Sequence, residues 1–210
     1  YAYYVTRYVN NDETQIHVDN TYRQQEMYFS TSNVYEILSK WSVSMSYDFK
    51  WNKLNANMVD FAFPHRYSNF VSLATALTLS RIQTQASLVE QVVKDHVKYG
   101  ASSSSRSTLT PAFFVNVYPF ESKLLAVRAF AKKSFRMPTF NDLYYADMGN
   151  SKLNPESALQ YDLGFVLNKD WKQGIVDHFR LQVDGYYNTV YDKIVAYPKV
   201  IHNLPTCLGA

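Results

Sequence analysis

A strict alternation of apolar and polar side chains marks residues 41–52. The apolar positions are Trp41, Val43, Met45, Tyr47, Phe49 and Trp51, and the polar ones are Ser42, Ser44, Ser46, Asp48, Lys50 and Asn52. This period of two predicts a β-strand with one apolar and one polar face. With about 3.3 Å per residue and a tilt of ~45°, the two tryptophans would lie roughly 23 Å apart along a membrane normal. That spacing is close to the ~25 Å apolar band of a membrane-spanning β-barrel, which has aromatic residues at both edges.

The same alternation recurs elsewhere in the chain. It is clear in residues 159–167 and 179–187 and weaker in 125–132. Further strands are expected over residues 1–9, 24–38, 67–80 and 82–99. In the last of these the phase drifts near Leu88 and Val93, which suggests bulges. We therefore expect about nine or ten strands, and the sequence has no helical periodicity.

The expected connections alternate in length. Short turns are predicted near residues 52–53, 80–81 and 169–174, and long loops over 100–107 and 134–157. Short turns on one side and long loops on the other are typical of outer-membrane barrels. The fold class predicted from these patterns is all-β, an antiparallel meander of long amphipathic strands that forms part of a transmembrane β-barrel.

A soluble β-sandwich that binds glycans is the main alternative, because its strands also have one wet face. Two features count against it. The expected strands run roughly 10–16 residues, which is above the usual five or six. Bulky side chains also occupy the face that should be wet, as at Tyr118, Phe130 and Tyr186.

Composition narrows the class further. Of 210 residues, 16% are aromatic and only 19% are charged, against about 25% charged in an average soluble domain. The net charge of +3 is too small to indicate a nucleic-acid partner. Cys207 is the only cysteine, which excludes an intrachain disulfide and a thiolate metal site. No apolar run approaches the ~20 residues of a membrane helix, so contact with a membrane would have to be made by strands.

Two sequence boxes lie in the predicted long loop. Residues 135–144 read Phe-Arg-Met-Pro-Thr-Phe-Asn-Asp-Leu-Tyr and residues 149–156 read Gly-Asn-Ser-Lys-Leu-Asn-Pro-Glu. This ordered pair, followed by the Gln-Tyr-Asp-Leu-Gly run at 160–164, resembles a signature in the barrel of TonB-dependent outer-membrane receptors. Residues 41–54 and 111–120 resemble barrel strands of the Bacteroidetes members of that family. The residues that carry the resemblance are Phe135, Arg136, Pro138, Thr139, Phe140, Asn141, Leu143, Tyr144, Gly149, Asn150, Leu153, Pro155 and Glu156.

The resemblance implies a function and a cellular location. It implies a segment of an outer-membrane transporter of a Gram-negative bacterium, which binds a scarce nutrient and imports it. The implied partners are outer-membrane lipid, the nutrient, and a TonB-type energy coupler that acts through an N-terminal plug. The resemblance implies neither a cofactor nor an enzymatic activity. A small passive outer-membrane barrel stays open as an alternative, although the loop-like sequence of residues 204–210 does not fit the end of such a barrel.

The chain length of 210 residues is short for a complete receptor barrel. A barrel of 22 strands with ~10 residues each needs about 220 residues in strands alone. We therefore expect residues 1–210 to be a partial receptor barrel without a plug domain, and residues 135–157 to form a long extracellular loop.

The boxes are expected to shape this loop rather than to touch a ligand. Pro138 removes a backbone donor and ends strand pairing. Gly149 and Asn150 suit a turn that can adopt positive φ, and Pro155 favours a return to extended structure. The candidate ligand-binding residues are Asp142, Tyr144 and Tyr145. Some haem receptors of this class have a histidine between the boxes. This chain has none between residues 136 and 155, although either tyrosine could ligate iron.

Other candidate sites are weaker. The five histidines (His17, His65, His96, His178 and His202) have no metal-ligand spacing. Two carboxylate pairs, Glu90 with Asp95 and Asp142 with Asp147, have glycosidase-like residue types, yet nothing shows that either pair converges. Lys132, Lys133 and Arg136 form a small basic patch that could attract an anionic ligand or lipopolysaccharide phosphates, but a solvated strand end is favoured. We therefore predict no catalytic residue and no metal site.

Overall fold

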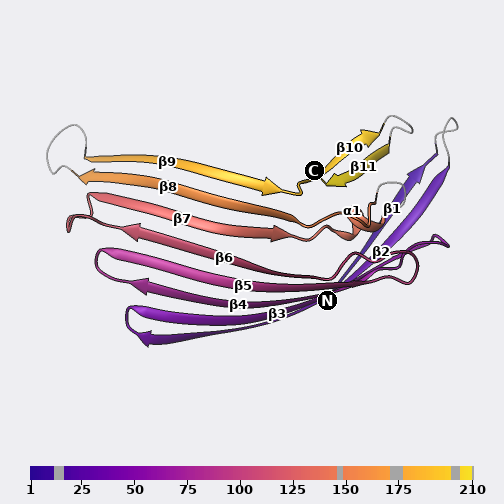
Figure 1. Cartoon of the computed structure of the whole chain (residues 1–210), viewed down its shortest axis with the longest axis horizontal. Coiled ribbons are helices and arrows are strands. Elements are labelled where there is room, and N and C mark those ends of the chain that lie inside the picture. The colour runs from indigo at the N-terminus through magenta and orange to yellow at the C-terminus, as the bar shows by residue number, and fades with distance from the viewer. Residues whose placement is uncertain (12–16, 146–148, 171–176, 200–203, 210) are drawn as a thin grey trace.

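The computed structural model describes residues 1–11, 17–145, 149–170, 177–199 and 204–209, and within them one large sheet dominates (Figure 1). Its nine strands are β1 (Ala2–Asn10), β2 (Val18–Leu38), β3 (Trp41–Ala56), β4 (His65–Thr78), β5 (Ile82–His96), β6 (Arg106–Val117), β7 (Leu125–Arg136), β8 (Glu156–Asp170) and β9 (His178–Tyr191). A short helix, α1 (Phe140–Tyr144), follows β7. A separate hairpin is formed by β10 (Ile194–Lys199) and β11 (Leu204–Gly209).

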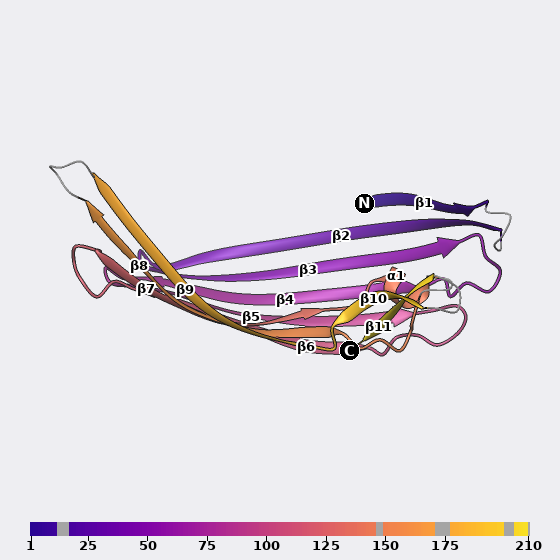
Figure 2. The ribbon, with the colours of Figure 1, turned by 90° about the horizontal axis from the view of Figure 1, so that it is seen from above.

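The large sheet is a simple meander. Its strands pair in the order β1 to β9, and every neighbouring pair is antiparallel. This confirms the predicted fold class, and it makes the β-sandwich alternative wrong, because a sandwich needs two stacked sheets. Seen from above, the sheet is curved and twisted, as a segment of barrel wall must be (Figure 2). Strands β1 and β9 are its two edges and do not pair with each other.

Strand register gives the sheet two chemically different faces. The outer face carries the apolar phase of each strand: Trp51 of β3 lies opposite Tyr67 of β4, and Leu125 of β7 lies opposite Leu167 of β8. The inner face carries the polar phase; Asn52 of β3 is the inner-face neighbour of Trp51. The alternation in the sequence therefore gives a mainly apolar outer surface and a mainly polar inner surface, because the unbroken register from β3 to β9 keeps the phases aligned.

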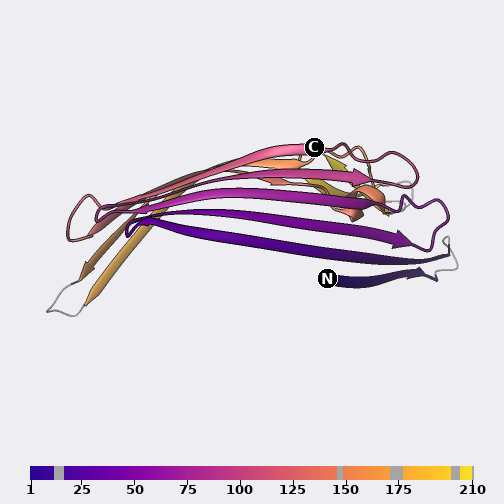
Figure 3. The ribbon, with the colours of Figure 1, turned by 90° about the horizontal axis from the view of Figure 1, so that it is seen from below.

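Long connections gather at one end of the sheet and short turns at the other (Figure 1). The long-connection end, which we call the loop end, holds residues 57–64, 97–105, 137–145 and 149–155, and with them α1 and the strands β10 and β11. The view from below shows the same grouping (Figure 3). The main buried cluster also lies at the loop end and comprises Tyr22, Leu54, Phe61, Phe140, Leu143, Tyr144 and Leu153. We call this cluster the cap.

Large apolar side chains are exposed over much of the outer face. Leu163, for example, is 64% exposed and Leu73 is 54% exposed. Such exposure would be costly in water but is favourable against lipid. Among the described residues, no helix has the length and apolarity to cross a membrane.

Several predictions about boundaries were wrong. No turn forms at residues 52–53, because both residues pair with β2 and with β4, and β3 continues to Ala56. Strand β5 has an unbroken register through Leu88 and Val93, and the bulge lies instead between Glu36 and Leu38 of β2. The alternation in β5 looks irregular because the apolar Val93 is buried on the inner face, whereas the polar residues Glu90, Lys94 and His96 lie on the outer face.

Two further predictions concerned the last third of the chain. Residues 204–209 were expected to be loop-like, but they form β11 and pair with β10. The predicted long loop at 135–157 is shorter in the structure, because β7 extends to Arg136 and β8 starts at Glu156. The predicted turn at 169–174 falls largely outside the described residues.

Candidate functional site

The first sequence box builds a short helix. Thr139 is its N-cap: the Asp142 N–H donates to Thr139 Oγ1 at 3.3 Å, and the Thr139 N–H donates to Asp142 Oδ2 at 2.8 Å. This reciprocal capping box satisfies two backbone donors that the helix itself leaves unpaired. Pro138, which precedes the N-cap residue Thr139, is fully buried. The box therefore starts α1 at a fixed point and directs it against the inner face of the sheet.

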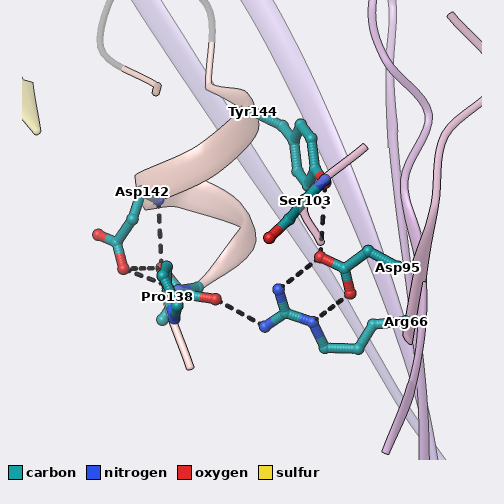
Figure 4. Close-up of polar contacts among 7 residues, drawn as sticks. Arg66, Asp95, Ser103, Pro138, Asp142 and Tyr144 are labelled. Carbon is teal, nitrogen blue, oxygen red and sulfur yellow. Dashed lines mark hydrogen bonds and ion pairs between the residues drawn. The ribbon is translucent and has the colours of Figure 1, made fainter. Parts of the chain in front are cut away.

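An ion pair on the inner face holds the start of this helix. Arg66 of β4 makes two parallel bonds to the Asp95 carboxylate of β5, from Nε to Oδ1 and from Nη2 to Oδ2, each at 2.7 Å. Its third nitrogen, Nη1, donates to the Pro138 carbonyl at 2.6 Å (Figure 4). The guanidinium also lies 5.0 Å from the centre of the Phe140 ring. Both charges are buried, and the bidentate geometry is what a buried pair needs.

Tyr144 links the same ion pair to a second connection. Its hydroxyl lies 3.4 Å from Asp95 Oδ2 and accepts a bond of 3.1 Å from the backbone N–H of Ser103, in the 97–105 connection (Figure 4). Burial, followed by the charge of Asp95, raises the pKa of the Tyr144 hydroxyl above its ordinary value. Burial also raises the pKa of Tyr145. An iron-bound tyrosinate is therefore less accessible at both positions than at an exposed tyrosine.

The second box closes the loop behind the helix. The Gly149 N–H donates to the Tyr145 carbonyl, and the Asn150 N–H donates to the Asp142 carbonyl, both at 2.8 Å. A Cβ at Gly149 would lie 2.7 Å from the Tyr144 nitrogen, which leaves room only for glycine. Asn150 Oδ1 accepts the Lys152 N–H at 3.0 Å, and Leu153 then enters the cap.

Charged residues tie the two ends of the loop together. Arg136, the last residue of β7, lies 3.7 Å from Asp142 and 3.9 Å from Glu156, the first residue of β8. Glu156 also accepts the backbone N–H of Ile194 at 3.2 Å, so β10 is tied to the same point. The structure thus brings Arg136, Asp142 and Glu156 together, which the sequence could place only within one loop.

The three candidate ligand-binding residues all have partners within the chain. Asp142 caps α1, Tyr144 is buried against Asp95 and Ser103, and Tyr145 stacks on Tyr22 with ring centres 4.1 Å apart. These contacts give each residue a structural role: Tyr144 belongs to the cap, Tyr145 packs against it, and Asp142 caps the helix that carries both. Ligand binding by them stays a prediction.

The other candidate sites do not assemble. Glu90 and Asp95 lie an odd number of residues apart on β5, on its outer and inner faces respectively, so this carboxylate pair does not converge. Asp147 lies outside the described residues. Lys132 is an inner-face residue and Lys133 an outer-face one, so the basic patch with Arg136 is divided between two surfaces. The described residues contain no group of three or more potential metal ligands.

A second polar arrangement lies nearer the short-turn end. Arg128 of β7 reaches across β8 to Asp184 of β9, with Nη2 2.5 Å from Oδ1. Gly164 lies between them, and a Cβ there would clash with the same Asp184 oxygen. The absence of a side chain at Gly164 of β8 therefore leaves room for the contact between Arg128 of β7 and Asp184 of β9.

A family described as "TonB dependent receptor-like, beta-barrel" has a model that matches residues 1–206. The chain belongs to this family. Its members are outer-membrane proteins of Gram-negative bacteria and are generally transport proteins rather than enzymes. The expected family and location are therefore confirmed, whereas a Bacteroidetes origin stays a prediction.

The individual proteins that this chain resembles are much longer than the chain. The vitamin B12 transporter BtuB of Photobacterium profundum is 35% identical over 83 residues, which is 38% of this chain and 12% of the relative. The Serratia marcescens hemophore receptor HasR, solved with its hemophore HasA and heme, has a TM-score of 0.64 at 11% identity over 91% of this chain and 38% of its own. The copper transporter OprC has a TM-score of 0.68 at 14% identity over 99% of this chain and 37% of its own. The chain thus spans well under half of these receptors.

Sequence reasoning missed how the cap is held, and it considered Asp95 only as a possible carboxylate partner of Glu90. Arg66, Asp95 and Ser103 lie outside both boxes, in two strands and a Ser-rich connection. One signal was available: Arg66 and Asp95 are charged residues next to the ends of long strands in a chain with few charges. Their pairing depends on register, which residue types alone do not show.

Proposed function

We propose that this chain is part of the barrel wall of a TonB-dependent transporter that imports a scarce nutrient across the outer membrane. Residues 1–210 would supply nine of the strands of a larger barrel, and the rest of that barrel and a plug domain would lie elsewhere in the same protein. The single observation that carries the proposal is the two-faced sheet, since its apolar outer face and polar inner face fit lipid and a wet lumen respectively.

The open edges support the incomplete wall. Strands β1 and β9 each have one unpaired edge. Unpaired backbone groups are costly in lipid, and in water a long open edge tends to pair with other chains. Further strands that pair with both edges would satisfy them and close the barrel.

We propose that the two sequence boxes shape the loop end. The supporting observations are the capping box at Thr139, the tight approach at Gly149 and the ion pair that holds Pro138. The cap lies on the inner face, at the end that carries the long connections, which in outer-membrane barrels is the extracellular end. The nutrient would meet loop surfaces beside the cap, and the cap would hold these loops in place.

Binding by Asp142, Tyr144 and Tyr145 remains a narrower proposal. Tyr145 is the best placed of the three, since it is only half-buried and presents a ring at the edge of the cap. The similar proteins are named for three different ligands, vitamin B12, heme and copper, so each of these is a candidate nutrient.

Uptake in whole cells tests the proposal. Cells with the complete gene, a deletion of it, or a deletion of the energy coupler would be given labelled vitamin B12, haem or copper in turn. We expect uptake of one of these nutrients that requires both the gene and the coupler. Uptake that requires the gene but not the coupler would favour the passive barrel, and no gene-dependent uptake of any of the three would contradict these candidates.

A further inference from the structure

A row of basic side chains lies on the outer face of the sheet, where lipid is expected. In the pairing register, Lys53 of β3 lies opposite His65 of β4, and His65 lies opposite His96 of β5. Lys98 follows two residues later, and its ammonium group lies 5.7 Å from the centre of the Phe63 ring and 5.0 Å from that of Tyr99. Lys53, Phe63, His65, His96 and Lys98 line one open hollow. We call Lys53, His65, His96 and Lys98 the outer basic patch.

The depth of this patch follows from the aromatic residues below it. Trp51 and Tyr67 pair on the outer face, two residues closer to the middle of their strands than Lys53 and His65. The Trp51 ring centre lies 6.2 Å from that of His65, and the Tyr67 ring centre lies 6.1 Å from that of His96. Lys53 is two residues beyond Trp51, which corresponds to about 5 Å along the membrane normal for a strand tilted by ~45°. Aromatic girdles mark the edge of the apolar band, so the patch lies at the level of the lipid headgroups.

The described residues do not neutralise the charge of the patch. None of the described carboxylates lies within 4.0 Å of the ammonium groups of Lys53 or Lys98. Two more cations, Arg23 and Lys94, are exposed at neighbouring outer-face positions. The outer-face carboxylate on β5, Glu90, lies further toward the membrane centre and accepts a bond from Ser107. The full charges of Lys53 and Lys98, with Arg23 and Lys94 at neighbouring positions, therefore favour an anion that both lysines of the patch can reach.

We infer that the outer basic patch binds a phosphate group of an outer-leaflet lipid. Two lysine ammonium groups and two imidazole N–H groups can donate to phosphate oxygens, and the hollow between them leaves room for the headgroup. The acyl chains of the same lipid then lie along the apolar outer face below Trp51 and Tyr67. Charge and depth together select a lipid phosphate over a free anion, because only the lipid satisfies both surfaces.

The test uses the complete transporter purified in detergent and titrated with diphosphorylated lipid A, with binding read by native mass spectrometry. The variant Lys53→Gln with Lys98→Gln removes the two full charges while keeping side chains of similar length. We expect it to weaken lipid A binding at least about tenfold, since each cation near an anionic headgroup contributes to affinity. The control is Lys123→Gln at the short-turn end, where Lys123 also lies over an aromatic ring, that of Tyr118.

Three outcomes would overturn the inference. One is unchanged lipid A binding in the double variant. Another is an equal loss in the Lys123→Gln control, which would indicate general charge attraction. The third is equal binding of dephosphorylated lipid A, or full competition by inorganic phosphate, which would exclude a lipid phosphate as the specific ligand. Nutrient uptake by the double variant, measured in parallel, shows that the barrel is folded and keeps this test separate from the transport proposal.

Discussion

Two leucines show how differently two regions of this chain use the same side chain. Leu54, in the cap, is 1% exposed and packs against loop residues, whereas Leu163, on the outer face of β8, is 64% exposed. In a water-soluble protein a whole sheet face of such exposed apolar side chains would be unfavourable. Here the outer face has lipid as its partner, so the sheet needs no core along most of its length. Only the loop end, where the chain meets water, folds like a small globular domain.

The largest expected effect comes from breaking the ion pair under the cap. Arg66→Met would leave the buried Asp95 carboxylate without its cationic partner, which costs about 3–5 kcal/mol. We expect residues 139–145 of the complete transporter to lose a corresponding amount of protection in hydrogen-exchange mass spectrometry. The double variant Arg66→Met with Asp95→Leu should recover much of that loss, because the unpaired charge is gone.

The exposed pair of Arg7 and Asp19 provides the control for that variant. Its atoms lie 2.6 Å apart, but both side chains are solvated. Arg7→Met should leave the cap unchanged, and an equal loss of protection in both variants would show that burial of the Arg66 pair does not matter.

The outer face is tested by placing a charge in it. Leu73 points outward near the middle of β4, and Ser72 beside it points inward. Leu73→Arg should destabilise the barrel by about 2–4 kcal/mol in equilibrium refolding into lipid vesicles, because arginine at the membrane centre is costly. Ser72→Arg should have a much smaller effect. Equal effects would mean that the two faces are assigned wrongly.

A smaller effect is expected at the strand crossing made by Arg128 and Asp184. Gly164→Ala adds a Cβ that clashes with Asp184 Oδ1, so the carboxylate must move away from Arg128. We expect a loss of about 1–3 kcal/mol, typical of overpacking, in the same refolding assay. Gly185→Ala is the matched control, because its new Cβ would come no closer than 3.8 Å to another atom. A larger loss at Gly185 would contradict this reading of Gly164.

The smallest expected effect is a dependence of the cap on alkaline pH. The folded cap raises the pKa of Tyr144, so the open form loses the proton first as pH rises. The stabilising contribution is therefore complete below pH of about 10 and is lost as pH rises through the raised pKa. A nitroxide at the exposed position Asn141 should become mobile at high pH, and Tyr144→Phe should weaken that transition. Identical pH profiles would show that another group is responsible.

The strands and their faces could be predicted because each depends on local alternation. Residues 41–51 needed no partner to reveal an apolar face, and pairing preserved it. The capping residues of α1 were visible as Thr139 and Asp142, yet a helix of five residues has no measurable period, so it was missed.

What could not be predicted depends on contacts between distant segments. Asn52 and Lys53 have turn-like composition, but pairing on both sides continues the strand through them. Arg66 and Asp95 meet only because β4 and β5 pair in one particular register, and Ser103 reaches Tyr144 through a connection whose sequence shows no preference for that path. For the candidate site, the sequence located the loop but not the strand residues that hold it.

Spin-label scanning of β3 tests the central claim most directly. Single cysteines at positions 41 to 51 of the complete transporter, with Cys207 and every other native cysteine replaced by serine, would carry nitroxides in lipid vesicles. The account predicts high oxygen accessibility at Trp41, Val43, Met45, Tyr47, Phe49 and Trp51 and low accessibility at the residues between them, with the maximum near the centre of the strand. Accessibility without a period of two, or the same in water and in lipid, would contradict a membrane-spanning wall.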